Sequence, residues 1–319
     1  MKPLGLIILS LLSMASSDLH AQNVSIAKYA GNKQAAISFT FDDGLKEQYT
    51  VLFPKMKELD IKGTFCLIGS RMEHQPKNPE KQTFTWEQAK EMAMDGQEIT
   101  SHGYNHKNVS KLTAEQLRYE VQHNDTLIYQ HTGVFPRTYF YPGNRKSDEA
   151  VAFCSQDRVG TRTEQVSLGS KRTQEWFENY LNNIISKGEW AVTMTHGIRF
   201  GYDSFGDETR LWKMFDHAKE QEKANKLWIA TFHDVAAYIQ ERDNTRLKIK
   251  NKGNLIVVSL KPLAKKKLNK KIFNVPLTLA INFQPKEIKQ NGRVLPVTYS
   301  QGKWLCNFSP FDGNIQIKK

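Results

Sequence analysis

Strand-like and helix-like segments alternate along residues 35–240, and this order constrains the fold more than any other feature of the sequence. The strand-forming stretch AAISFTF (35–41) precedes the helix-forming stretch KEQYTVLFPKMKELD (46–60), and a second strand-like stretch, KGTFCLIG (62–69), follows. The alternation continues to EWAVTMTH (189–196) and beyond. Strands that alternate with helices of roughly 10–15 residues are typical of βα units in a parallel sheet or barrel. We therefore predict an α/β fold for this part of the chain.

The sequence changes character near residue 245. Residues 245–319 hold 16 Lys and Arg against 2 Asp and Glu, a net charge of +14, whereas the remaining 29 basic and 31 acidic residues give −2. Short strand-like stretches, such as LTLAINF (277–283), are separated there by Gly, Pro and Asn. We predict a domain over 22–244 followed by a small, basic, β-sandwich-like domain over 245–319. The lysine cluster KKKLNKK (265–271) is typical of a solvated loop or sheet edge.

The first 21 residues have the pattern of a signal peptide. Lys2 precedes the apolar run PLGLIILSLLSMA, and small and polar residues follow it. We expect cleavage after Ala21, with Ala15 as the alternative. No later segment is long and apolar enough for a membrane helix, so the sequence predicts an exported protein, periplasmic or extracellular, without a transmembrane segment. Nothing in it indicates a nucleic-acid partner. The three cysteines lack CxxC spacing, and Cys66 is expected to be a buried core thiol.

Two adjacent carboxylates, Asp42 and Asp43, end the first strand-like stretch and precede Gly44 in ISFTFDDG. Ordinary turn chemistry is one explanation of this Asp-Gly pattern. The other is that two carboxylates lie at the C-terminal end of a barrel strand, where α/β enzymes place their reactive groups. The rest of the chain decides between the two.

Two histidines four residues apart, His102 and His106, occur at the end of another strand-like stretch, QEITSH. Neutral imidazoles bind Zn²⁺ and similar ions, and catalytic zinc sites commonly use three protein ligands and leave a position open. A carboxylate from the Asp42-Asp43 pair would complete such a ligand set. Together the two motifs predict a divalent metal site at the strand ends.

These motifs resemble those of the polysaccharide deacetylases with a NodB homology domain, carbohydrate esterase family 4, over roughly residues 30–242. TFDDG at 40–44 matches the first motif and His102-x-x-x-His106 the second. The resemblance implies a distorted (β/α) barrel of about seven strands that removes acetyl groups from glycans. It also implies that Asp42 is the general base and that Asp43, His102 and His106 bind one divalent metal, Zn most often, with Co, Ni, Fe or Mn as alternatives.

Two further motifs carry over from the resemblance. In Tyr141-Pro142-Gly143, the Gly143 N–H would form part of an oxyanion hole, and Tyr141 and Pro142 would contact substrate. In Met194-Thr195-His196, Met194 would line the acetyl pocket and His196 would be the general acid.

The sequence also departs from the family pattern. Gly103 stands between the two histidines where the family has Ser or Thr, and Ser101 is the expected substitute. The usual arginine is missing beside the third motif, so Arg162 is our candidate for holding Asp42 ionised, with Arg137 as the alternative. The fourth motif, which orients the catalytic histidine, cannot be located.

The resemblance favours an exported deacetylase that acts on an N-acetylated glycan resembling chitin, peptidoglycan or poly-N-acetylglucosamine. Two alternatives remain open: an esterase that removes O-acetyl groups from a polysaccharide such as xylan, and a catalytically silent carbohydrate-binding protein. The basic C-terminal region favours an anionic polymer as an additional partner. Aromatic residues after His196 are candidates for stacking on sugar rings, with core packing as the alternative: Phe200, Tyr202, Phe205 and Trp212.

Overall fold

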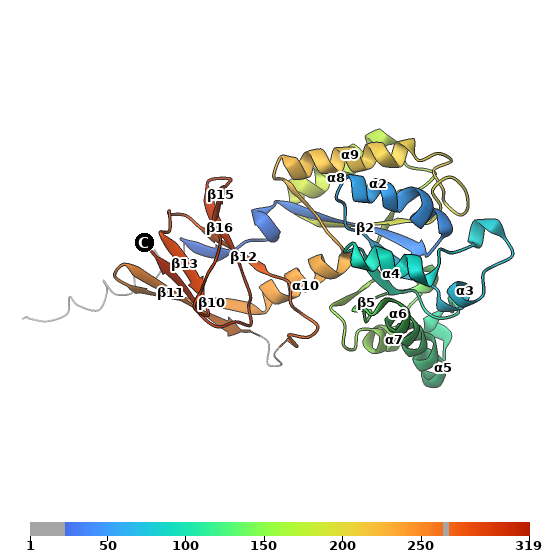
Figure 1. Cartoon of the computed structure of the whole chain (residues 1–319), viewed down its shortest axis with the longest axis horizontal. Helices are drawn as coiled ribbons and strands as arrows, with labels where there is room; N and C mark the ends of the chain where they lie inside the picture. Colours follow the sequence, from blue (N-terminus) through green and yellow to red (C-terminus); the bar gives the residue numbers. More distant parts are fainter. Residues whose placement is uncertain (1–22, 264–267) are drawn as a thin grey trace, which may run out of the picture. The chain divides into compact units, whose positions relative to one another are not determined.

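A computed structural model describes residues 23–263 and 268–319 (Figure 1). The predicted signal peptide and Lys265–Lys267 of the lysine cluster lie outside the described residues. The described chain divides into two compact units, one formed by Lys33–Ala237 and the other by residues 23–32 with Tyr238–Lys319. No helix in the described residues is long and apolar enough to cross a membrane.

The larger unit contains one sheet of eight strands, and all of its strand pairs are parallel. Seven strands follow the order β6-β5-β4-β3-β2-β8-β7, and β9 pairs with the beginning of β2. The predicted α/β class is confirmed, with one strand more than the roughly seven expected. The strands are β2 (Ala35–Asp43), β3 (Thr64–Leu67), β4 (Glu98–Ser101), β5 (Thr138–Phe140), β6 (Gly160–Arg162), β7 (Val166–Ser167), β8 (Trp190–Thr195) and β9 (Leu227–Ile229).

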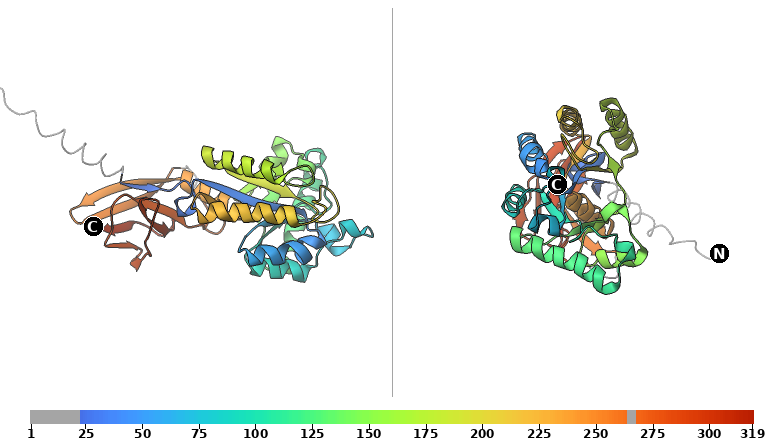
Figure 2. Two further views of the ribbon diagram at one scale, coloured as in Figure 1. Left: turned by 90° about the horizontal axis from the view of Figure 1, so that it is seen from above. Right: turned by 90° about the vertical axis from the view of Figure 1, so that its right-hand side faces the viewer.

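Helices lie around these strands, as the right-hand view of Figure 2 shows. Helix α8 illustrates why they form: Thr173 caps its first turn, Gly188 ends it at a φ of 66°, and its buried residues recur at helical spacing. The helices are α2 (Phe53–Glu58), α3 (Gly69–Glu73), α4 (Trp86–Met94), α5 (Ala114–Arg118), α6 (Asn124–Thr132), α7 (Asp148–Cys154), α8 (Gln174–Lys187), α9 (Thr209–Lys223) and α10 (Phe232–Asp243). Two π-helical turns adjoin them, Gln48–Leu52 before α2 and Tyr119–His123 between α5 and α6.

The two faces of the parallel sheet differ in chemistry. Successive side chains of a strand point to opposite faces, so Phe39 and Phe41 enter the apolar core while Thr40 and Asp42 face the other side. Register then places Asp42, Cys66 and Thr100 in one row across β2, β3 and β4. The sheet therefore has a polar face that gathers side chains from widely separated parts of the sequence.

The second unit contains two antiparallel sheets, ordered β1-β12-β16-β15 and β10-β11-β17-β13-β14. The predicted all-β C-terminal region is confirmed, but β1 (Val24–Ile26) joins it by pairing with β12. The division between the units thus falls at 32/33 and 237/238, whereas the sequence placed one boundary at 244. The remaining strands are β10 (Thr245–Lys252), β11 (Leu255–Pro262), β12 (Leu277–Ile281), β13 (Glu287–Gln290), β14 (Arg293–Val294), β15 (Thr298–Ser300), β16 (Lys303–Phe308) and β17 (Ile315–Lys318).

Candidate active site

The carboxyl end of β2 separates the two adjacent aspartates. Asp42 is almost fully buried on the polar face of the sheet, at 3% exposure. Asp43 and Gly44 both have positive φ, 77° and 69°, so the chain turns sharply at this point. Aspartate and glycine tolerate this left-handed backbone better than most residues. The turn therefore gives two neighbouring carboxylates different surroundings.

Asp43, His102 and His106 come together at the strand ends. The Oδ1 atom of Asp43 lies 3.7 Å from Nε2 of His102 and 3.7 Å from Nε2 of His106. Arg71 donates to the other oxygen, Oδ2, at 2.8 Å. Oδ1 is buried and accepts no hydrogen bond within the described residues. One carboxylate oxygen and two ring nitrogens thus converge on one point.

A hydrogen bond to the backbone determines which ring nitrogen of His102 can bind a metal. Its Nδ1 lies 2.8 Å from the carbonyl oxygen of Phe140, which as an acceptor requires the proton on Nδ1 and leaves the Nε2 lone pair facing Asp43. Burial lowers the pKa of His102 to about 4, although Asp42 and Asp43 act in the opposite direction. The ring is therefore neutral at pH 7, the form that binds metals.

The donor set fits a divalent cation such as Zn²⁺. Zinc takes nitrogen and carboxylate oxygen ligands at about 2.0–2.2 Å, which places tetrahedral ligand atoms about 3.3–3.6 Å apart. The three ligand atoms here lie within 4.8 Å of one another, two of the pairs at 3.7 Å. The unsatisfied oxygen of Asp43 also fits, since a cation would complete its interactions.

Asp42 is instead bound by Arg162. The guanidinium of Arg162 donates to both carboxylate oxygens, at 2.7 and 2.6 Å, and one of its nitrogens also donates to Thr40 at 2.6 Å. Burial alone would raise the pKa of Asp42, but the charge and hydrogen bonds of Arg162 hold that pKa well below its usual range. The structure thus brings Arg162 to Asp42. The alternative, Arg137, bonds the Asp157 carbonyl instead.

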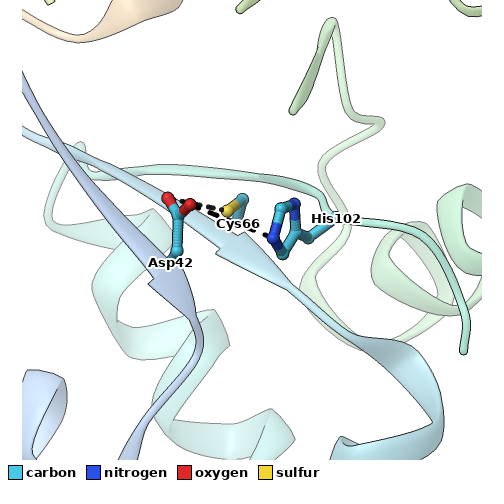
Figure 3. Close-up of side chains that lie close together, drawn as sticks. All are labelled: Asp42, Cys66 and His102. Carbon is cyan, nitrogen blue, oxygen red and sulfur yellow. Dashed lines mark hydrogen bonds and ion pairs between the residues drawn. The ribbon is translucent and has the colours of Figure 1, made fainter. Parts of the chain in front are cut away.

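A second cluster of potential ligands consists of Asp42, Cys66 and His102, whose side chains point toward one another in Figure 3. The Cys66 thiol donates to Asp42 at 3.3 Å. Burial raises the pKa of this thiol well above its usual value, and a thiol must lose its proton to bind a metal. Asp42 is already held by the Arg162 cation. Asp43, His102 and His106 are therefore the better ligand set.

His196 faces Asp42 from the end of β8, with Nε2 at 4.0 Å from Oδ2 of Asp42. The side chain of Gln48, absent from our sequence-based expectations, donates to the backbone carbonyls of Asp42 (2.7 Å) and His196 (3.1 Å). The Nδ1 atom of His196 is buried without a hydrogen bond in the described residues. Within residues 23–263 and 268–319, no carboxylate accepts a hydrogen bond from Nδ1 of His196, so none performs the orienting role of the fourth family motif. The ring instead meets Tyr202 edge-on, at 4.9 Å between centroids.

The loop between the two histidines is held mainly by Glu120. Its Oε1 accepts the backbone N–H of Asn105 at 2.8 Å and that of Lys107 at 3.0 Å. Ser101, the expected substitute, accepts the Gly103 N–H only at 3.4 Å. Glu120 was missed, although its position gave a signal. It shares the buried helix face of Leu117 and Val121, where a charged residue is unusual.

The residues expected to contact substrate lie in different surroundings. Gly143 is exposed after β5 with φ 59°, next to the buried Pro142. Met194 shares the face of Thr40 through the β2–β8 register. Tyr141 is 1% exposed in an apolar cluster, and its backbone carbonyl accepts the N–H of Asn144 at 2.9 Å, so the structure does not present Tyr141 to a ligand as the sequence predicted.

The aromatic residues after His196 divide into two groups. Phe200 and Tyr202 are 49% and 75% exposed, whereas Phe205 and Trp212 pack against the core. Phe200 also lines a hollow of about 340 Å³ that begins beside the site, between Leu45 and Gly197. Core packing therefore accounts for two of the four residues, and stacking on a sugar remains open for the other two.

Comparison with known proteins connects this site to a family. Residues 30–158 match the family model described as polysaccharide deacetylase. The chain is 29% identical over 137 residues to a putative polysaccharide deacetylase, YxkH, of Bacillus subtilis, covering 41% of this chain and 46% of that protein. It is also 29% identical over 179 residues to the peptidoglycan-N-acetylmuramic acid deacetylase PdaA of B. subtilis, covering 56% and 57%. The chain thus spans about half the length of these curated relatives.

Among solved structures, the chain resembles a mutant of a CE4 family pseudoenzyme from Bacillus anthracis in which enzymatic activity was restored. The TM-score is 0.50 at 21% identity, and the match covers 64% of this chain and 68% of that one. At this identity the likeness concerns the fold alone. It agrees with the parallel sheet and surrounding helices described above.

Proposed function

We propose that this chain is a metal-dependent hydrolase that removes N-acetyl groups from a glycan, on the premise that its residues 30–158 match the polysaccharide deacetylase family model. The observation that carries the proposal is the difference between two adjacent carboxylates. Asp42 is held ionised by Arg162, whereas Asp43 turns a free oxygen toward two neutral histidines. A site that only bound sugar would need neither arrangement.

Each residue then has a distinct task. A divalent cation bound by Asp43, His102 and His106 would supply Lewis-acid polarisation of water and of the acetyl carbonyl. Asp42 accepts a proton from the attacking water, because Arg162 keeps it ionised and a hydrogen-bonded carboxylate still offers free lone pairs.

Three further residues act on the acetyl group and the leaving amine. The backbone N–H of the exposed residue Gly143 donates to the developing oxyanion. His196 donates a proton to the departing nitrogen, because an amine is a poor leaving group unless it is protonated. Met194 provides apolar surface for the acetyl methyl group. Gln48 ties the backbones of Asp42 and His196 together, which keeps the base and the acid at a fixed separation.

The substrate class rests on the relatives. Two of them are named as deacetylases of peptidoglycan sugars, in B. subtilis and B. cereus. The signal-peptide pattern would deliver this chain to the periplasm or the outside of the cell, where such polymers lie. Hydrolysis of O-acetyl esters uses the same residues and remains the main alternative. Catalytic silence is the second alternative, because no hydrogen bond orients Nδ1 of His196 within the described residues.

Metal analysis combined with a substrate panel tests the proposal. We expect about one divalent cation per wild-type chain after purification without chelator, and less in His102→Ala. The wild type should release acetate from N-acetylated oligosaccharides faster than from acetylated xylan. Faster release from the xylan would make it an esterase. Metal binding without acetate release from either substrate would make it a binding protein.

A specific observation favours a second role, for the C-terminal unit. Arg246, Lys248, Lys250 and Lys252 alternate along β10, and all four are exposed on one face of the sheet. Register adds Lys261, which lies directly opposite Arg246. Like charges opposite each other destabilise a sheet, so folding alone does not favour this arrangement.

The same face continues across the sheet to Lys318 and to Lys289, whose charge is paired with Glu287 at 2.8 Å. We propose that this basic face (Arg246, Lys248, Lys250, Lys252, Lys261 and Lys318) binds an anionic glycan or cell-wall polymer. None of the six forms an ion pair within residues 23–263 and 268–319. Unpaired, exposed cations attract polyanions over a Debye length of about 8–10 Å.

A further inference from the structure

Glu120 does more than fill space beneath the metal-binding loop. Its side chain is 1% exposed, and it belongs to the π-helical turn Tyr119–His123 between α5 and α6. Insertions of this kind into α-helices are found frequently at functional sites. The turn brings the carboxylate of Glu120 directly beneath the loop that carries His106, 14 residues away in the sequence.

The Glu120 carboxylate accepts hydrogen bonds from the residues on both sides of His106. One oxygen, Oε1, accepts the N–H of Asn105 and the N–H of Lys107, while Oε2 lies 3.4 Å from the Asn105 side-chain amide. His106 itself has a φ of 57°, a left-handed conformation that costs a non-glycine residue free energy. Two hydrogen bonds on its flanking amides offset that cost and fix the direction of its side chain.

Gly103 is part of the same arrangement. A Cβ at this position would lie 2.8 Å from Oε1 of Glu120 and 3.2 Å from the phenolic oxygen of Tyr139. A Ser or Thr, the residue types usual at this position, would thus collide with Glu120 where it now lies. The backbone also has a φ of 77°, which favours glycine. Glu120 and Gly103 therefore depend on each other.

We propose that Glu120 is a positioning residue for the metal site, which replaces the missing loop hydroxyl by holding His106 in its ligating conformation. The inference rests on the proposed function in that Asp43, His102 and His106 must bind a cation. Removing an outer-shell partner of a metal ligand typically costs 10–100-fold in metal affinity. Glu120 contacts neither substrate nor cation in this role, so its effect should appear in metal binding first.

The test titrates the full chain, freed of metal by a chelator, with Zn²⁺ against a chromophoric competitor, and with Co²⁺ followed by visible absorption. Glu120→Ala should raise the Zn²⁺ dissociation constant about 10–100-fold and change the Co²⁺ spectrum. Glu120→Gln should lose much less, because one amide oxygen can still accept both backbone N–H groups. Glu115→Ala, an exposed carboxylate on neighbouring α5, is the matched control and should leave both readouts unchanged.

Gly103→Ala keeps the proposal testable if Glu120→Ala folds poorly by circular dichroism, because its Cβ would lie 2.8 Å from Oε1 of Glu120 and displace the carboxylate without removing it. Gly103→Ala alone should weaken Zn²⁺ binding, and Gly103→Ala with Glu120→Ala should weaken it by less than the product of the two single effects. Folded Glu120→Ala with wild-type affinity, or independent effects in the double variant, would overturn the proposal. A wild-type chain that binds neither Zn²⁺ nor Co²⁺ would instead overturn the proposed function.

Discussion

The two units of this protein use charge in opposite ways. In Lys33–Ala237 the decisive charges are buried and paired, as in Arg162 with Asp42 and Arg158 with Asp125, where the exposed fractions of the side chains are 2–6%. On β10 of the other unit, four cations are exposed on one strand. Buried charges act through short, directional contacts, and breaking one is costly. Exposed charges cost folding little and act at a distance, in a way that salt weakens.

The largest effect should follow from changing the chemistry of a buried charge without changing its shape. Asp42→Asn should lower turnover by about 10²–10⁴, because loss of a general base typically has this size. On the scale of 1.36 kcal/mol per tenfold, that is about 3–5 kcal/mol of activation free energy. The variant should keep its metal, since Asp43, His102 and His106 remain. The checks are acetate release and metal content of the same preparation.

Asp43→Asn is the matched control for that experiment. It changes the neighbouring carboxylate in the same way, and it should lose metal together with activity. If Asp42→Asn loses the metal and Asp43→Asn keeps it, the roles of the two aspartates are reversed. If neither variant loses turnover, the buried charge of Asp42 is structural.

The next effect should appear in folding. Arg162→Met removes the cation and leaves the Asp42 carboxylate buried, so we expect the free energy of unfolding at pH 7 to fall by about 3–5 kcal/mol. Denaturant titration of the metal-free chain measures it. Arg137→Met is the control, because the Arg137 guanidinium bonds only a backbone carbonyl and lies over the Phe135 ring. A loss no larger than the control's would mean that the ion pair contributes little beyond its packing.

The sequence could predict some of these contacts and not others, depending on whether they join neighbouring or distant parts of the chain. The convergence of Asp43, His102 and His106 could be predicted, because the Asp pair and the His pair each end a strand-like stretch, and parallel strands bring those ends to one edge. Arg162 could only be a candidate, since its contact with Asp42 spans 120 residues. Gln48 and Glu120 reach the site from helical turns. The sequence around each of them does not indicate which backbone groups it will bind.

Domain boundaries show the same limit. The charge asymmetry correctly separates an α/β region from an all-β one, because composition is a property of whole segments. It cannot assign β1, whose three residues join the C-terminal unit through pairing with β12, more than 250 residues later. The pairing also affects experimental design: cutting the chain at 244 would remove the partner of β1, so the two units are better compared by substitution.

The smallest effect on folding, and the sharpest contrast with Asp42, should come from the basic face. Replacing Arg246, Lys248, Lys250 and Lys252 by Gln should change unfolding free energy by no more than about 0.5 kcal/mol per site, as is usual for exposed residues. Turnover on a neutral chitooligosaccharide should stay at the wild-type level. Binding to a polyuronate in low salt should weaken strongly, and the difference from wild type should shrink as salt rises, because screening shortens the reach of the charges.

A second variant with four Lys→Gln changes on the larger unit, at Lys90, Lys111, Lys171 and Lys187, separates the basic face from net charge. These lysines are also exposed, and both variants lose the same charge. If both weaken polyuronate binding alike, net charge alone is responsible and the basic face has no special role. If neither does, the alternating cations of β10 serve to keep an edge strand from pairing with other chains, a use of lysine that sheet edges commonly show. Only a selective loss in the β10 variant supports the basic face as a surface that binds an anionic polymer.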